Sequence, residues 1–168
     1  MRKLRETLGY LIGGLTFVLL IPALMWLVSG RPSLLDIPVL RFVVAIVIAL
    51  LGLSLSVRSI VHMRRRGDGN PMDAFSHEVA PRTKHLMTDG PYRLSRNPML
   101  TGSFIYYAAV CLLIWAWPAL LVFAAFIAIM LLQVRSEERR LLRDFPTEYP
   151  TYCNQTSRFW PKFRKKKQ

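Results

Sequence analysis

The sequence predicts an all-α membrane protein with four transmembrane helices. Two observations lead to this fold class: long stretches without a charged residue, and basic residues that gather between those stretches. The 168 residues are 52% hydrophobic yet carry a formal net charge of +13. A soluble nucleic-acid-binding domain mixes basic side chains with short periodic apolar stretches, so this segregation argues against nucleic acid as a partner.

The predicted helices span about residues 8–28, 39–61, 99–117 and 119–145. The first and third stretches contain no charge and are close to the roughly 20 residues that cross a bilayer core. The second carries Arg41 and Arg58 near its ends, from where long side chains reach the interface. The fourth is apolar to residue 134 and keeps a helical pattern to residue 145. Because three more spans follow the first, we expect it to be an uncleaved helix and not a signal peptide.

The placement of basic residues predicts the orientation. They precede the first helix, occur in the loop 62–98 and follow residue 134 of the fourth helix, whereas the opposite side holds almost none. The positive-inside rule therefore predicts a multi-pass membrane protein with both termini and this loop in the cytoplasm. In a prokaryote this membrane is expected to be the plasma or inner membrane. The whole chain, 1–168, is expected to form one membrane domain, and the basic end of its tail 146–168 to bind anionic lipid headgroups.

A Trp-Ala-Trp-Pro sequence at residues 115–118 predicts a tight hairpin of the third and fourth helices. In an antiparallel hairpin, residues 99 and 134 emerge side by side on the cytoplasmic face. The segment before the third helix then lies next to the segment after the fourth.

The start of the third helix is the first candidate site. Asn97 is a good N-cap, and Pro98 is a favoured first helical residue. The free N–H groups of this helix end, flanked by Arg93 and Arg96, suit a carboxylate or a phosphate. An ordinary cap with arginines bound to lipid phosphates is the competing interpretation.

The end of the fourth helix is the second candidate site. Helical spacing places Glu138 on the apolar stripe with Val134, and Glu137 beside Gln133. A carboxylate just outside the bilayer suits a cationic amine or a sulfonium group. Salt bridges with arginines on the same helix are the alternative.

Together these segments form a recognisable pattern. Gly90-Pro91-Tyr92 and Arg96-Asn97-Pro98 are followed by Glu137-Glu138, and then by Phe145, Tyr149, Tyr152 and Arg158-Phe159-Trp160-Pro161. This two-part pattern, over about residues 84–161, resembles the isoprenylcysteine carboxyl methyltransferase and phospholipid N-methyltransferase families. The resemblance implies an integral membrane enzyme that uses S-adenosylmethionine, with its cofactor pocket on the cytoplasmic side.

The resemblance also implies which residues bind the cofactor. In those families they are the residues before a Gly-x-Tyr turn, the turn tyrosine, an Arg-His-Pro-x-Tyr sequence and a glutamate of the Glu-Glu pair. The matching positions here are Lys84, His85, Leu86, Met87, Tyr92, Arg96, Asn97, Pro98, Met99, Leu100, Glu137 and Glu138. This chain departs from the pattern twice, because Asn97 replaces the usual His and Leu100 the usual Tyr.

For the substrate, the resemblance points to Gln133 and Arg135. In the prenylcysteine enzymes an arginine one turn before the glutamate holds the substrate carboxylate, and Gln133 stands at that position here. This departure argues against a prenylcysteine carboxylate, although prenylated cysteine, phosphatidylethanolamine and a small thiol all remain compatible acceptors. Glu138 and Arg135 are the predicted catalytic residues, and an amine acceptor would lose its proton to Glu138 or His85.

The sequence therefore predicts S-adenosylmethionine-dependent methyl transfer to a lipophilic acceptor that enters from the bilayer. A sterol-reductase-like enzyme that uses NADPH is the first alternative, but the chain is short for it and the Glu-Glu pair is more typical of the methyltransferases. A non-enzymatic membrane scaffold is the second. No Cys or His spacing typical of a metal site occurs, so no metal is expected.

Overall fold

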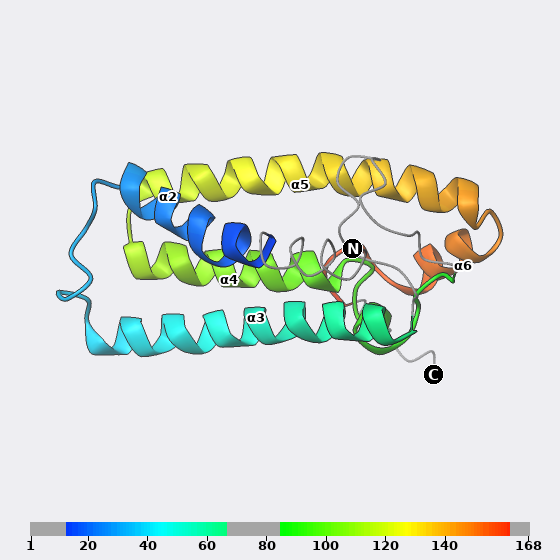
Figure 1. Cartoon of the computed structure of the whole chain (residues 1–168), viewed down its shortest axis with the longest axis horizontal. Helices are drawn as coiled ribbons and strands as arrows, with labels where there is room; N and C mark the ends of the chain where they lie inside the picture. The colour runs from blue at the N-terminus through cyan, green and yellow to red at the C-terminus, as the bar shows by residue number, and fades with distance from the viewer. Residues whose placement is uncertain (1–12, 67–84, 162–168) are drawn as a thin grey trace, which may run out of the picture. The chain divides into compact units, whose positions relative to one another are not determined.

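The computed structural model describes residues 13–66 and 85–161, and within these ranges every regular element is helical. This confirms the all-α prediction. The elements are the π-helical segment Thr16–Leu20 (η1), the α-helices Ile21–Val28 (α2), Val39–Arg66 (α3), Pro98–Ile114 (α4), Trp117–Asp144 (α5) and Glu148–Gln155 (α6), and the 3₁₀ turn Gly90–Arg93 (η2) (Figure 1).

The helix boundaries agree with the sequence signals at the start of α4 and differ from them at the end of α3 and at the reversal between α4 and α5. Helix α4 ends at Ile114, before the predicted residue 117, and α5 begins at Trp117, before the predicted residue 119. Helix α4 begins at Pro98, as the Asn97-Pro98 pair predicts. Helix α3 continues to Arg66, into the predicted loop 62–98, and three arginines in its last turn complement the negative end of the helix dipole. The predicted tail 146–168 contains α6, a helix that no local pattern in the sequence predicts. The start of the first helix lies outside the described residues.

Two of the helices are long and apolar enough to cross a membrane, namely α3 and α5. The other two predicted spans correspond to shorter apolar helices, Gly13–Val28 and Pro98–Ile114. The four-span topology and its orientation therefore stay predictions.

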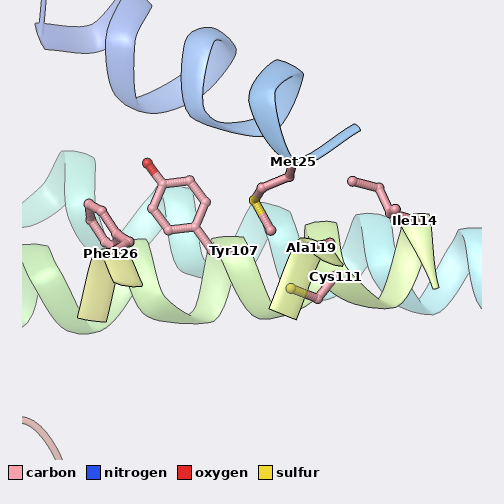
Figure 2. Packing of buried hydrophobic residues seen from close by; sticks show 6 residues of the cluster. All are labelled: Met25, Tyr107, Cys111, Ile114, Ala119 and Phe126. Atoms are coloured by element: carbon pink, nitrogen blue, oxygen red, sulfur yellow. The ribbon is translucent and has the colours of Figure 1, made fainter. Parts of the chain in front are cut away.

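The chain packs as two compact units, to both of which α3, α4 and α5 contribute. Unit 1 comprises residues 1–53 and 103–131, and unit 2 comprises residues 54–102 and 132–168. In unit 1, α4 and α5 are joined by two residues only, which is the tight reversal expected at the Trp-Ala-Trp-Pro sequence. The core of this unit is made by Met25, Tyr107, Cys111, Ile114, Ala119 and Phe126, and Figure 2 shows Met25 reaching from α2 toward α4.

Pro22, at the start of α2, leaves two backbone carbonyls of unit 1 without a helical hydrogen-bond donor. The N–H of Ile21 bonds to the carbonyl of Thr16, and Pro22 follows without any N–H. Pro22 would otherwise be the π-helical partner of the Phe17 carbonyl and the α-helical partner of the Val18 carbonyl. Two adjacent tyrosines of α4 supply the donors: the hydroxyl of Tyr107 lies 2.8 Å from the Phe17 oxygen, and that of Tyr106 lies 2.9 Å from the Val18 oxygen.

Candidate functional site

Unit 2 contains a cavity of about 70 Å³ between the candidate segments. Its walls come from the end of α3, from the segment that leads into α4, from the C-terminal part of α5 and from α6. The lining residues are Met63, Leu86, Met87, Tyr92, Arg96, Asn97, Val134, Glu137, Glu138, Arg140, Leu141, Tyr149 and Tyr152.

Many of the sequence-predicted residues meet at this cavity. Those that line it are Leu86, Met87, Tyr92, Arg96, Asn97, Glu137 and Glu138. His85 and Arg135 are exposed, Pro98 and Leu100 are buried, Met99 and Gln133 are intermediate, and none of these six lines it. Lys84 lies outside the described residues.

Glu138 forms the centre of an ion-pair cluster, here called the Glu138 cluster, with Arg96 and Arg158. The guanidinium of Arg158 binds both carboxylate oxygens, with Nε at 3.0 Å and Nη2 at 2.7 Å. The Nη2 of Arg96 lies 3.1 Å from Oε1 of the same carboxylate. The side chains of Arg96 and Glu138 are only 13% and 17% exposed, so water screens this pair weakly. The hydrogen bond from Arg158 to Glu138 is the main reason why the pKa of Arg158 is raised.

Arg96 connects the Glu138 cluster to α6. Its Nη1 donates to the sulfur of Cys153, and its guanidinium carbon lies 5.8 Å from the centre of the Tyr149 ring. Its Nε is buried and has no hydrogen-bond partner among the residues that the structure describes. One donor of a cavity-lining arginine thus remains for a ligand.

The segment after α6 packs on the start of α4. The backbone N–H of Arg96 donates to the Ser157 carbonyl at 2.9 Å, and the side-chain amide of Asn97 donates to the Arg158 carbonyl at 3.1 Å. The N–H of Asn97 itself bonds to the hydroxyl of Ser95. These two backbone donors next to the helix start are therefore already used, whereas the Arg96 side chain keeps a donor for an anion there. Arg93, its other predicted flank, is exposed.

Tyr92 is held in the cavity wall by its backbone. Its N–H bonds to the Asp89 carbonyl at 3.0 Å, and its own carbonyl accepts a 2.5 Å hydrogen bond from the hydroxyl of Tyr152. The Tyr152 ring centre lies 6.4 Å from that of Tyr149. Three largely buried tyrosines therefore share one wall of the cavity.

The two glutamates of the Glu-Glu pair differ in environment. The carboxylate of Glu137 is 40% exposed and lies 3.8 Å from Arg140 on the next turn, which is the helix salt bridge that the sequence left as an alternative. Burial is the main cause of the raised pKa of Tyr92, and the negative charge of Glu137 adds to it. Glu138 is inward and paired with two arginines. Glu137 is thus the carboxylate better placed to meet a ligand.

Burial raises the pKa values of Tyr92, Tyr149 and Tyr152 well above the ordinary value of 10. The unfolded chain therefore releases these phenolic protons at a lower pH than the folded protein does. The stability linked to the three groups is fully present below pH 10 and is lost as the pH rises through the raised pKa values.

We expect thermal stability to fall steeply above pH 10, and the Tyr149→Phe/Tyr152→Phe variant to lose less of it than the wild type over the same range. Melting temperatures measured across this range check the prediction, with phenolate absorbance as a second readout. Equal alkaline slopes in the two proteins would contradict it.

Tyr149, Tyr152 and Arg158 belong to the quoted pattern, but the sequence alone predicts no role for them. The signal was their spacing after the Glu-Glu pair, which places two aromatic rings one turn apart on a short helix. Met63 carried no signal, because nothing local distinguishes it from the other apolar residues of α3.

Comparison of the chain with known protein families agrees with the two-part pattern. A family model described as phospholipid methyltransferase matches residues 40–148. No curated protein and no solved structure matches the chain. The matched range covers the cavity residues of α3, of the segment before α4 and of α5, and it ends just before Tyr149.

Proposed function

This chain belongs to the phospholipid methyltransferase family, and on that premise we propose that it transfers a methyl group from S-adenosylmethionine to a phospholipid amine or a similar lipophilic acceptor. The observation that supports the proposal best is the shared cavity: both predicted segments line it, together with the tyrosines of α6. The family assignment supports methyltransferase activity, and the two long apolar helices support a membrane location.

The residues of the cavity fit the charges of this cofactor. S-adenosylmethionine supplies, when bound, a methyl group on a positively charged sulfur, and it carries an amino-acid end of both charges. The unpartnered Nε of Arg96 suits the carboxylate, and the carboxylate of Glu137 suits the ammonium group. The rings of Tyr92 and Tyr152 offer aromatic faces to a cation without adding a charge.

The chain's part in the reaction is to position the reactants and to exclude water. Holding the acceptor atom in line with the methyl group contributes several kcal/mol, up to about 7–11 in well-oriented systems. The apolar side chains of Met87, Val134 and Leu141 make much of the wall dry. Such a wall also protects the acceptor from competing reactions with water.

An amine acceptor must be neutral before it attacks a methyl group. Of the two proton acceptors that the sequence analysis named, Glu138 already binds guanidinium groups with both oxygens. This favours His85, which is exposed and directly precedes the cavity residue Leu86. We therefore propose Glu138 as the residue that positions Arg96 and Arg158, with Gln133 and Arg135 as substrate contacts on α5.

Calorimetric titration of the detergent-solubilised protein with S-adenosylmethionine tests the cofactor site. We expect Glu137→Gln to weaken binding at least about tenfold, which corresponds to roughly 1.4 kcal/mol. The melting temperature should change little, because a helix pair at 3.8 Å with a 40% exposed carboxylate contributes only about 0.3–0.5 kcal/mol to stability. Glu148→Gln is the matched control, since this glutamate is exposed on α6 and does not line the cavity.

Two results would overturn the proposal. One is undiminished binding of S-adenosylmethionine in both Glu137→Gln and Glu138→Gln. The other is stabilisation of the wild type by NADPH and not by S-adenosylmethionine. Incubation of membranes with methyl-labelled S-adenosylmethionine then identifies the acceptor, because label in the lipid fraction supports a phospholipid amine and label in the protein fraction supports a prenylated cysteine.

A further inference from the structure

A histidine of α3 contacts the turn that carries Tyr92, although it does not line the cavity. The Nε2 of His62 lies 2.8 Å from one carboxylate oxygen of Asp89, and Nη1 of Arg66 lies 2.7 Å from the other. Asp89 stands directly before the turn Gly90–Arg93 and uses its carboxylate for these contacts, since it makes no capping hydrogen bond to the turn. The turn is therefore tied to the last turns of α3.

The contact is close because residue 90 has no side chain. A Cβ atom at Gly90 would lie 2.5 Å from Cε1 and 2.7 Å from Nε2 of the His62 ring. The φ angle of Gly90 is +56°, which other residues rarely adopt. The imidazole thus occupies the space that any other residue at position 90 would fill.

From Gly90 the geometry continues into the cavity wall. Two residues later, Tyr92 is 7% exposed and lines the cavity, and its ring centre lies 6.4 Å from that of His62 with an angle of 31° between the planes. The N–H of Tyr92 bonds to the carbonyl of Asp89, the residue whose carboxylate His62 binds. A shift of the imidazole would therefore move the residue that fixes the Tyr92 backbone.

We propose that His62 is a positioning residue of the methyl-transfer site, which acts by holding Asp89 and Gly90 so that Tyr92 faces the cofactor. This inference rests on the proposed function, and it adds to it a residue outside the two motifs. The groups that face the imidazole are the carboxylate of Asp89, the guanidinium of Arg66 beside that carboxylate, and the ring of Tyr92. His62 touches neither the cavity nor a reacting atom.

A double-mutant cycle tests the contact between positions 62 and 90. Gly90→Ala forces a methyl group into the imidazole, so we expect it to weaken S-adenosylmethionine binding more than about tenfold. His62→Ala removes the clash partner and the tie to Asp89, and we expect a loss of about threefold to tenfold. The combined variant should lose less affinity than the product of the two single losses, because the added methyl group then enters the space vacated by the ring and only the strain of the positive φ angle remains.

Gly30→Ala is the matched control for backbone strain. Gly30 also has a positive φ angle, +79°, but a Cβ atom there would meet nothing within 4 Å. This variant should therefore keep the wild-type affinity. His62→Gln, whose side-chain amide can also reach Asp89, should recover most of the affinity that His62→Ala loses. It should also keep the pH profile of methyl transfer, because a positioning residue takes no proton from the acceptor.

The proposal fails if the effects of Gly90→Ala and His62→Ala on affinity are additive, or if His62→Ala binds as tightly as the wild type. It also fails if His62→Gln loses a limb of the pH profile, which would assign the proton transfer to His62 itself. Melting temperatures of the wild type, His62→Ala, Gly90→Ala and the combined variant, measured without ligand, report the contact between positions 62 and 90 independently of the cofactor. If the wild type does not bind S-adenosylmethionine while this coupling is present, the proposed function is wrong and the contact is real.

Discussion

Glu138→Ala is expected to destabilise the protein by about 3 kcal/mol and to abolish measurable binding of S-adenosylmethionine. The variant removes the shared acceptor of the Glu138 cluster and leaves Arg96, 13% exposed, without its carboxylate partner. An uncompensated charge in a weakly solvated site is costly because the lost ion pair is not replaced by hydration. Arg158, with 40% of its side chain exposed, can turn to water and adds less to the loss.

A second variant separates stability from function. Arg96→Met/Glu138→Leu removes the buried charges together, so its stability should return to near the wild-type level. Cofactor binding should stay absent, because the unpartnered donor of Arg96 is gone. Thermal unfolding and calorimetric titration of both variants, beside Glu137→Ala, provide the measurements. A Glu138→Ala protein as stable as Glu137→Ala would contradict this account of the Glu138 cluster.

Tyr107→Phe is expected to cost about 1–3 kcal/mol of stability, which is large for the loss of one hydroxyl. The side chain is fully buried, and its hydroxyl is the donor to the Phe17 carbonyl. That carbonyl lacks a π-helical partner because Pro22 carries no N–H. In an apolar surrounding, an unsatisfied backbone carbonyl has no water to bond to, so the loss exceeds that of an ordinary hydrogen bond.

Pro22→Ala tests whether the proline is the reason why the Phe17 carbonyl needs the Tyr107 hydroxyl, because the variant restores a backbone N–H at position 22. In that background Tyr107→Phe should be much less costly, because the helix can satisfy its own carbonyls. Melting temperatures of the wild type, the two single variants and the double variant measure the coupling. Equal costs of Tyr107→Phe with and without Pro22 would show that the proline is not the reason for the hydrogen bond.

Local signals were enough to predict the helices and much of the candidate site. Pro98 starts α4 because proline suits a first helical turn, a preference that acts within a few residues. The segment Leu86–Asn97 and the pair Glu137-Glu138 were expected to meet because a tight reversal follows α4, and they do line one cavity. The role of each glutamate could not be predicted, because helical spacing gives the face on which each side chain lies but not the distant residues that it meets, such as Arg158.

Local signals do not predict helix α6 or the position of the segment after it. The stretch Glu148–Gln155 contains a proline and two tyrosines and has little intrinsic helix preference. Its tyrosines are buried against the cavity, and the hydroxyl of Tyr152 bonds to the Tyr92 carbonyl, 60 residues away in the chain. Burial and this hydrogen bond stabilise the helix, and neither is visible in a local window.

The sequence by itself determined the helical class, the apolar stretches and the family, because hydrophobic runs, caps and short motifs act between near neighbours in the chain. Only the tertiary structure decided which of the 23 basic residues pair with Glu138, that His62 approaches Gly90, and that two tyrosines complete a proline-interrupted helix. The physical reason is that ion pairs, ring contacts and hydrogen bonds to unpaired carbonyls depend on distances of a few ångströms between residues far apart in the sequence. Those distances are set by packing and not by local preference.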